Sequence, residues 1–219
     1  MPTRHLAKLI KDLSEMFRCR PATRPRQSIG LLLIAVLMGS AGLATGAGGD
    51  ELARMVHSGQ HVLLVRHAYA PGTGDPDDFR LGDCSTQRNL SDEGRTQARA
   101  MGAWLRDQGI DSARLYSSEW CRCVETAERM DLGPVTPLPA LNSFYQRPED
   151  RAPNLAALKD FLAAQPAQEK PLVLVTHQVT ISALTGDFVA SGEGVLARIG
   201  EAGGLRPVIG EQAHTLSWG

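Results

Sequence analysis

The chain has 219 residues, 42% of them hydrophobic, and its 23 Lys and Arg residues nearly balance 24 Asp and Glu residues. The basic residues gather at the start. Residues 1–47 hold seven basic and two acidic residues, a charge of +5, which leaves −6 for residues 48–219. An acidic chain has no bulk electrostatic attraction for nucleic acid, so we expect none as a partner. About 170 residues are enough for one domain with an adequate core.

Residues 1–47 have the three parts of a secretory signal peptide. A basic head is followed by ten apolar residues, 29–38, and then by small residues as far as Ala47. Cleavage is expected after Ala44 or Ala47, which makes residues 48–219 a periplasmic or secreted domain. Ten strongly apolar residues are few for a bilayer crossing. The small residues lengthen the apolar stretch, however, so an uncleaved inner-membrane anchor is the alternative.

Hydrophobic periodicity and turn residues predict alternating helices and strands after the signal segment. In chain order they are a helix at 50–57, a strand at 61–66, a long aperiodic loop at 69–90, a helix from Ser91 to about Gly109, a strand at 114–116, a helix from Ser118 to about Met130, a strand at 135–138, a helix ended by Pro166, a strand at 171–176, a helix to Leu184, and a hairpin of strands at 194–199 and 205–209. Such alternation predicts an α/β fold with a mainly parallel sheet covered on both faces.

Two of these strands are unbroken apolar runs, as buried parallel strands are, and a histidine follows each run. The first strand ends in Arg66-His67 and the second in Thr176-His177. Ligands of open α/β sheets bind at the carboxyl ends of the strands, so both imidazoles are predicted to reach one crevice. Arg122, near the start of a helix between the two strands, is placed to join Arg66 around an anion.

Four ordered motifs carry a family resemblance. They are Arg66-His67 at the strand end, Leu90-Ser91-x-x-Gly94-x-x-Gln97-Ala98, Ser117-Ser118-x3-Arg122-x2-Glu125-Thr126-Ala127, and Thr176-His177. In these motifs the chain resembles the histidine phosphatase superfamily, branch 1, over the range from about His61 to Leu184. The resemblance implies a phosphoglycerate mutase-like fold, a three-layer sandwich with a mainly parallel sheet.

The resemblance also implies the roles of the site residues. His67 is expected to be a nucleophile that forms a phosphohistidine, which water then hydrolyses. Arg66, Arg122 and His177 are expected to bind the phosphoryl oxygens, and two bidentate arginines suit a dianionic phosphoryl group. Phosphoryl transfer depends mainly on positioning and charge stabilisation, so no metal or other cofactor is expected.

The predicted function is therefore that of an exported phosphatase, a phosphoric monoester hydrolase acting on a small phosphorylated substrate. Contact with a membrane is expected only through the signal segment, if that segment stays uncleaved. The alternative is a phosphate-ligand binding protein with a degenerate active site that lacks the general acid.

The chain departs from the family pattern at three positions. Ala68 and Gln178 stand where glycine is usual, and Ser143 stands where many relatives have a general-acid glutamate. Glu149 and Asp150 follow closely and are candidate substitutes for this acid, although a solvated turn explains them as well. The 69–90 loop offers three more carboxylates: Asp75, Asp77 and Asp78. The sequence does not choose among these acids.

Three cysteines remain if Cys19 leaves with the signal peptide, so at most one disulfide forms within the chain. Cys84 lies in the long loop, and Cys121 and Cys123 flank the predicted phosphate-binding arginine. Residues two apart on a helix point about 200° apart, so only one of this pair can face Cys84. An oxidising compartment favours that bridge, and three free thiols are the alternative. The cysteines lack the spacing of a zinc site.

Overall fold

The structure, a computed structural model, describes residues 47–165, 170–207 and 216–218. The predicted signal peptide, except for Ala47, lies outside the described residues, as does the end of the predicted 205–209 strand. Within the described part of the chain, no helix has both the length and the apolar character that a membrane crossing requires.

Six strands form one sheet in the order β3-β2-β4-β1-β5-β6. Their bounds are β1 His61–Arg66, β2 Arg114–Ser117, β3 Val135–Pro137, β4 Leu172–Thr176, β5 Gly194–Ile199 and β6 Leu205–Pro207. The first four strands in this order run parallel, whereas β5 is antiparallel to β1 and β6 is antiparallel to β5. The prediction of a mainly parallel sheet is confirmed, and the two apolar strands β1 and β4 are neighbours at its centre.

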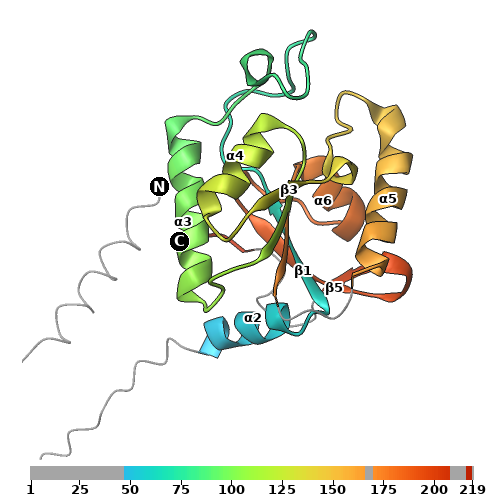
Figure 1. Ribbon diagram of the computed structural model, residues 1–219. Coiled ribbons are helices and arrows are strands. Elements are labelled where there is room, and N and C mark those ends of the chain that lie inside the picture. Colours follow the sequence, from blue (N-terminus) through green and yellow to red (C-terminus); the bar gives the residue numbers. More distant parts are fainter. Residues whose placement is uncertain (1–46, 166–169, 208–215, 219) are drawn as a thin grey trace, which may run out of the picture. The chain divides into compact units, whose positions relative to one another are not determined.

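Helices cover both faces of the sheet, and Figure 1 shows α3 and α5 on opposite sides of it. The helices are α2 Ala47–His57, α3 Asp92–Asp107, α4 Cys121–Met130, α5 Arg151–Ala163 and α6 Gln178–Thr185. One hydrophobic core packs α2, α3 and α4 against one face, and a second core packs α5 and α6 against the other. This is the predicted three-layer α/β sandwich.

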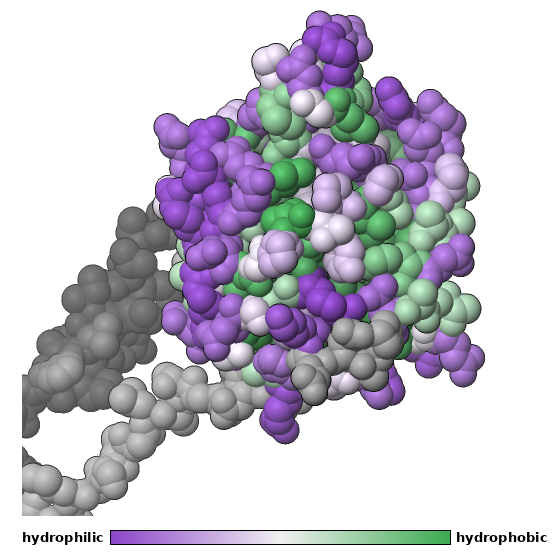
Figure 2. Space-filling view, in the orientation of Figure 1, coloured by the Kyte–Doolittle hydropathy of each residue, from purple (hydrophilic) through white to green (hydrophobic). Residues whose placement is uncertain are grey.

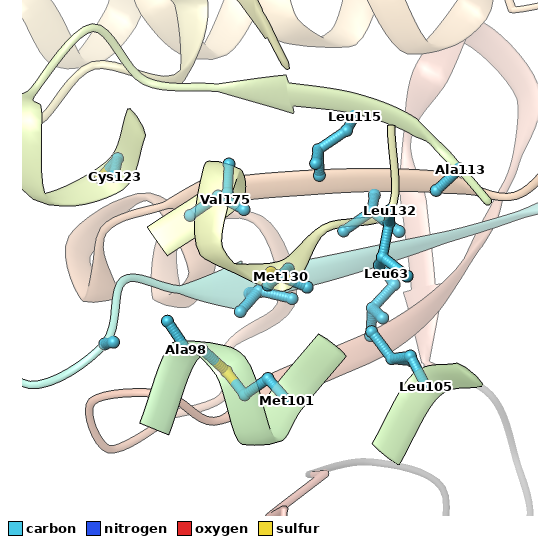
Figure 3. Packing of buried hydrophobic residues seen from close by; sticks show 14 of the residues in the cluster. Leu63, Ala98, Met101, Leu105, Ala113, Leu115, Cys123, Met130, Leu132 and Val175 are labelled. Atoms are coloured by element: carbon cyan, nitrogen blue, oxygen red, sulfur yellow. The ribbon is translucent and has the colours of Figure 1, made fainter. Parts of the chain in front are cut away.

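Side chains of β1 alternate between the two cores, because successive residues of a strand point to opposite faces. Leu63 and Val65 belong to the core beneath α3 and α4, while Val62 and Leu64 belong to the core beneath α5. Figure 3 shows Leu63 packed among labelled side chains of α3 and α4. All four residues are fully buried, so β1 is a rigid base for the Arg66-His67 pair at its end.

The start of α3 fixes the path of the chain after β1. The Ser91 side chain accepts a hydrogen bond from the Gly94 backbone N–H at 3.1 Å, so Ser91 is the N-cap of the helix that the sequence predicts from this residue. A Cβ atom on Gly94 would overlap the backbone carbonyl of Tyr69. Glycine at this position therefore allows the 69–90 segment to begin in close contact with α3.

The helix α4 begins later than the sequence predicts. We expect Ser118 to be its N-cap, but the first helical residue is Cys121, and Trp120 precedes it without a side-chain cap. The Ser118 hydroxyl instead contacts His177 and Asn142. Tertiary partners of this hydroxyl thus replace the local capping bond that the sequence pattern favours.

The 69–90 segment stands above the carboxyl edge of the sheet, at the top of Figure 1. Its tip and the outer side of α3 form strongly hydrophilic regions in Figure 2, and hydrophobic residues show mainly between them. The segment is not structureless, because Cys84–Thr86 form a 3-10 helix and Arg80 pairs with Asp83.

Candidate active site

The two strand-end histidines meet at the carboxyl edge of the sheet. β1 and β4 pair in parallel with Arg66 opposite Thr176, and the His67 backbone N–H donates to the Thr176 carbonyl at 3.0 Å. The rings of His67 and His177 have centroids 5.5 Å apart and lie edge to face. Both side chains are buried, with exposed fractions of 2% and 4%.

His67 presents one nitrogen to the site and anchors the other. Its Nδ1 lies 2.8 Å from the carbonyl oxygen of Ala68, which only accepts hydrogen bonds, so the proton is on Nδ1. Nε2 is then the nitrogen with the lone pair, and the Arg122 Nε–H donates to it at 3.2 Å. Burial, followed by the charge of Arg122, lowers the pKa of His67 well below its ordinary value. The imidazole is therefore neutral and Nε2 has the electron pair that a nucleophile needs.

Arg122 reaches both imidazoles from the first turn of α4. Besides the contact with His67, its Nη2 lies 3.5 Å from His177 Nδ1. Thr126, one turn further along the helix, accepts from the Ala68 backbone N–H at 3.0 Å and donates to the Arg122 carbonyl at 2.6 Å. This threonine connects the chain after β1 to α4 and so fixes the position of His67 relative to Arg122.

One cavity of about 170 Å³ is lined by all four predicted site residues: Arg66, His67, Arg122 and His177. Its lining comprises Arg66, His67, Gly72, Thr73, Gly74, Asp75, Phe79, Arg88, Trp120, Arg122, Ser143, Tyr145, Gln146, Arg147, His177, Gln178 and Val179. The Arg66 Nη1–H donates to the Val189 carbonyl at 2.8 Å, while its buried Nε has no hydrogen-bond partner among the described residues. The cavity is therefore a concave, cationic site beside a nucleophilic nitrogen.

The carboxylate in this cavity is Asp75. It forms an ion pair with the Arg122 guanidinium at 2.8 Å, and the two side chains are only 2% and 3% exposed. Oδ1 also accepts from the Arg88 backbone N–H, and Oδ2 accepts from the Trp120 indole N–H, both at 3.0 Å. Arg122 is thus clamped between the imidazole of His67 on one side and Asp75 on the other.

The model of the histidine phosphatase superfamily (branch 1) matches residues 62–144, a range that holds the first three of the four motifs. Over this range the chain is similar to this superfamily. Over 71 residues it is 35% identical to the mitochondrial serine/threonine-protein phosphatase Pgam5 of Drosophila virilis, which corresponds to 32% of this chain and 22% of that protein. The chain thus covers about a fifth of the length of this relative.

Several solved structures are similar to this chain. The protein histidine phosphatase SixA complexed with tungstate has 19% identity and a TM-score of 0.49, over 67% of this chain and 92% of that one. A putative phosphohistidine phosphatase SixA from Agrobacterium tumefaciens has 18% identity and a TM-score of 0.48, over 73% and 99%. A phosphoserine phosphatase mutant from Entamoeba histolytica, in complex with phosphoserine, has 15% identity and a TM-score of 0.44, over 71% and 93%.

The two candidate acids that follow Ser143 do not line the cavity. Ser143 lines it, as expected for the position of the usual glutamate, whereas Glu149 is exposed and neither it nor Asp150 is part of the lining. Both belong to the 3-10 helix Pro148–Asp150, which leads directly into α5. Neither of the two therefore lies in the cavity wall, and a general-acid role for either stays a prediction.

The structure pairs Cys84 with Cys121 and leaves Cys123 as a buried free thiol. The Cys84–Cys121 disulfide joins the 69–90 segment to the first residue of α4, next to Arg122. Cys123 lies on the other side of the helix, with its Sγ 3.4 Å from His177 Nε2. Burial raises the pKa of the Cys123 thiol to about 12, so this thiol stays protonated and unreactive.

Sequence reasoning missed several residues of the site. Arg88 lines the cavity and donates from Nε to the Gly74 carbonyl at 2.7 Å, but it comes from an aperiodic loop that carries no pattern. Ser118, which lies inside the third motif, contacts the second histidine, and Asn142, which directly precedes Ser143, contacts Ser118. Their proximity to the motifs is the one signal in the sequence that pointed to them.

Proposed function

We propose that this domain is a phosphatase that hydrolyses small phosphomonoesters through a phosphohistidine on His67. The observation that carries the proposal is the 3.2 Å contact between Arg122 Nε and the unprotonated Nε2 of His67. It places a nucleophilic lone pair directly beside a guanidinium that can hold a phosphoryl oxygen. Arg66 and Arg88 add two more cationic side chains to the same cavity.

The reaction takes two steps in this proposal. In the first, the lone pair of His67 Nε2 forms a bond to phosphorus while the bond from phosphorus to the leaving oxygen breaks, and the leaving oxygen takes up a proton from water. In the second, water attacks phosphorus and releases a proton to the solvent, the P–N bond breaks, and its electron pair returns to Nε2. Arg66, Arg122 and His177 hold the phosphoryl oxygens throughout, which is the positioning and charge stabilisation that phosphoryl transfer requires.

A second function, binding of a phosphorylated ligand without turnover, is favoured by one observation. Asp75 is the single carboxylate among the described residues that line the cavity. Both of its oxygens already accept hydrogen bonds from Arg122, and each accepts from one further donor. The described lining therefore places no carboxylic acid to protonate a departing oxygen, which slows phosphorylation of His67 for poor leaving groups.

Trapping the phosphoenzyme tests the first function against the second. A pulse of ³²P-labelled phenyl phosphate followed by rapid quench should give a label on the protein that is labile in acid and stable in base. His67→Ala should abolish the label and turnover, whereas His61→Ala, a matched change at the far end of the same strand, should keep both. Normal turnover by His67→Ala would contradict the assignment, and binding of phosphate without turnover by the unchanged protein would favour the second function.

We also propose that the protein is exported by its N-terminal segment. The disulfide between Cys84 and Cys121 supports this, because such bonds form and persist in oxidising compartments. Cell fractionation with N-terminal sequencing should find the domain in the periplasm or medium, beginning after Ala44 or Ala47. Recovery of the intact N-terminus in the membrane fraction would favour the anchored alternative, and recovery in the cytosol would refute export.

A further inference from the structure

A short chain of hydrogen bonds connects His177 to Glu119 through two uncharged side chains. The His177 Nε2 atom lies 2.9 Å from the Ser118 hydroxyl, which donates to Asn142 Oδ1 at 3.2 Å. The Asn142 side-chain NH₂ in turn donates to the Glu119 carboxylate at 2.7 Å. The hydroxyl of Ser118 and the ring of His177 are fully or almost fully buried, so water does not compete for the bond between these two residues.

The orientation of the Asn142 amide is determined by groups that have only one hydrogen-bonding role. The Glu119 backbone N–H only donates, and it lies 2.9 Å from Asn142 Oδ1. The Glu119 carboxylate accepts, and it lies against the Asn142 nitrogen. The amide oxygen therefore faces Ser118, and because this oxygen can only accept, the single hydroxyl proton of Ser118 is committed to it.

This polarity decides which nitrogen of His177 holds the proton. With its own proton committed, the Ser118 oxygen can only accept from His177, so the proton is on Nε2. The remaining nitrogen, Nδ1, has the lone pair and faces the Arg122 Nη2–H at 3.5 Å, again a donor-to-acceptor contact. We propose that Ser118, Asn142 and Glu119 are positioning residues that hold His177 as its Nε2–H tautomer, with Nδ1 directed at the phosphoryl cavity.

The two imidazoles of the site are then opposite tautomers. His67 has its proton on Nδ1, held by the Ala68 carbonyl, and His177 has its proton on Nε2, held by Ser118. Both lone pairs point at Arg122, so the guanidinium has one acceptor at Nε and another at Nη2. When a phosphoryl group enters, His177 can gain a proton only at Nδ1, where it faces the ligand, while the anchored Nε2–H keeps the ring in place.

The tautomer can be measured without substrate, by ¹⁵N-edited NMR of the protein labelled in its histidine rings. Protonated and unprotonated ring nitrogens differ strongly in ¹⁵N chemical shift, and loss of one ring signal set in His177→Gln assigns the resonances. We expect a protonated Nε2 and an unprotonated Nδ1 for His177. A protonated Nδ1 with an unprotonated Nε2 in the unchanged protein would overturn the proposal, whether or not any variant folds.

Substitutions test whether Ser118 is the cause. Ser118→Ala should shift the His177 ring to a mixture of tautomers, and Ser118→Thr, which keeps the hydroxyl, should restore the single form. Ser117→Ala is the matched control, because this neighbouring buried hydroxyl donates to the Ser118 carbonyl at 2.8 Å and touches neither histidine. An unchanged His177 spectrum in folded Ser118→Ala would overturn the proposal. If Ser118→Ala does not fold, Asn142→Leu replaces it. A mixture of His177 tautomers in this variant would support the proposal, and an unchanged His177 spectrum would overturn it.

The kinetic consequence rests on the proposed function. Ser118→Ala should lower kcat by up to about 10²-fold, since a misplaced ring no longer supports the phosphoryl group. Ser117→Ala should keep the kcat of the unchanged protein. An equal loss in both variants would mean that Ser118 acts only through folding and would overturn its positioning role. Absence of turnover in the unchanged protein would refute the phosphatase proposal alone, because the NMR reading stands without it.

Discussion

Arg122 connects the chemical parts of the site through one guanidinium. Its Nε donates to His67, its Nη2 faces His177, and its Nη1 forms the ion pair with Asp75. Because Arg122 and Asp75 are almost fully buried, their charges depend on each other and on nearby hydrogen bonds rather than on water. The same residue that is expected to hold a phosphoryl group is therefore also a stabilising element of the fold.

Arg122→Ala should destabilise the folded protein as well as abolish activity. The substitution leaves the Asp75 carboxylate buried without its cationic partner, and breaking a buried pair in this way costs about 3–5 kcal/mol in the free energy of unfolding. Asp75→Asn in the Arg122→Ala background removes the stranded charge and should restore a large part of the stability without restoring turnover. Urea unfolding of the single and double variants measures both effects, and equal stability of all three proteins would contradict the buried-pair argument.

Because Ser143 stands where many relatives have a general-acid glutamate, we expect the rate of His67 phosphorylation to depend strongly on the leaving group. A positioned acid contributes about 10²–10⁴-fold to proton transfer, and the described lining holds no free carboxylic acid. Phosphorylation of His67 should therefore be much faster with aryl phosphates of low phenol pKa than with alkyl phosphates. Rapid-quench rates over a graded series of aryl phosphates should show a steep slope. A flat series would mean that an acid acts, and Asp75→Asn, Glu149→Gln and Asp150→Asn would then identify it by restoring the slope.

At the scale of elements, the 69–90 segment and α4 act as one unit. The segment brings Asp75 and Arg88 to the cavity, and the Cys84–Cys121 disulfide ties it to the residue before Arg122. Gln87 adds a further link, since its side-chain oxygen accepts from the Cys121 backbone N–H at 3.0 Å. A long loop without regular periodicity is thus held to the helix that carries the phosphate-binding arginine.

Removing the disulfide should loosen this unit. Closing a loop with a sequence separation of 37 residues is worth about 3–4 kcal/mol in the chain-entropy model, so Cys84→Ser with Cys121→Ser should lower the free energy of unfolding by about that amount. Activity should fall as well, because Asp75 no longer stays on Arg122. Thiol counting on the unreduced, denatured mature domain should find one free thiol, Cys123. Three free thiols there would refute the bridge in the natural protein.

At the scale of the whole molecule, the fold keeps two imidazoles neutral at the edge of its sheet. Burial, followed by the charge of Arg122, holds the pKa of His67 and of His177 well below the ordinary value of 6.5. Unfolding exposes both rings, which then bind protons near pH 6.5. The folded state therefore binds fewer protons than the unfolded state below this pH, and the domain is expected to lose stability on acidification.

The free energy of unfolding should be insensitive to these two groups above about pH 6.5 and should fall as the pH drops from there toward their folded-state pKa. The slope is roughly 1.4 kcal/mol per pH unit for each histidine, and His177→Gln should remove about half of the combined slope. Urea unfolding between pH 5 and 8 measures this slope. The carboxylates of Asp83 and Glu125, whose pKa values are lowered, titrate below this pH range and do not contribute to the slope. A stability that is flat from pH 8 to 5 would contradict buried neutral histidines.

The amino-acid sequence by itself determined the architecture and the principal site residues. The apolar runs before His67 and His177 are typical of central parallel strands, and the carboxyl ends of such strands meet at one edge of the sheet, where both histidines emerge. Ser91, a favourable N-cap residue followed by two acidic residues, likewise indicated where α3 begins. These features are local, since the period and composition of a short segment contain the information.

Only the tertiary structure decided which polar groups of the loops reach the cavity. Asp75 was one of three loop carboxylates in the sequence, and it differs from Asp77 and Asp78 because Arg122, Trp120 and the Arg88 backbone converge on it. Cys121 rather than Cys123 met Cys84 because Cys121 faces the 69–90 segment, where its backbone N–H donates to the Gln87 side chain, whereas Cys123 is buried beside His177. Such choices depend on contacts between segments distant in sequence, where no local period or propensity distinguishes one side chain from its neighbour.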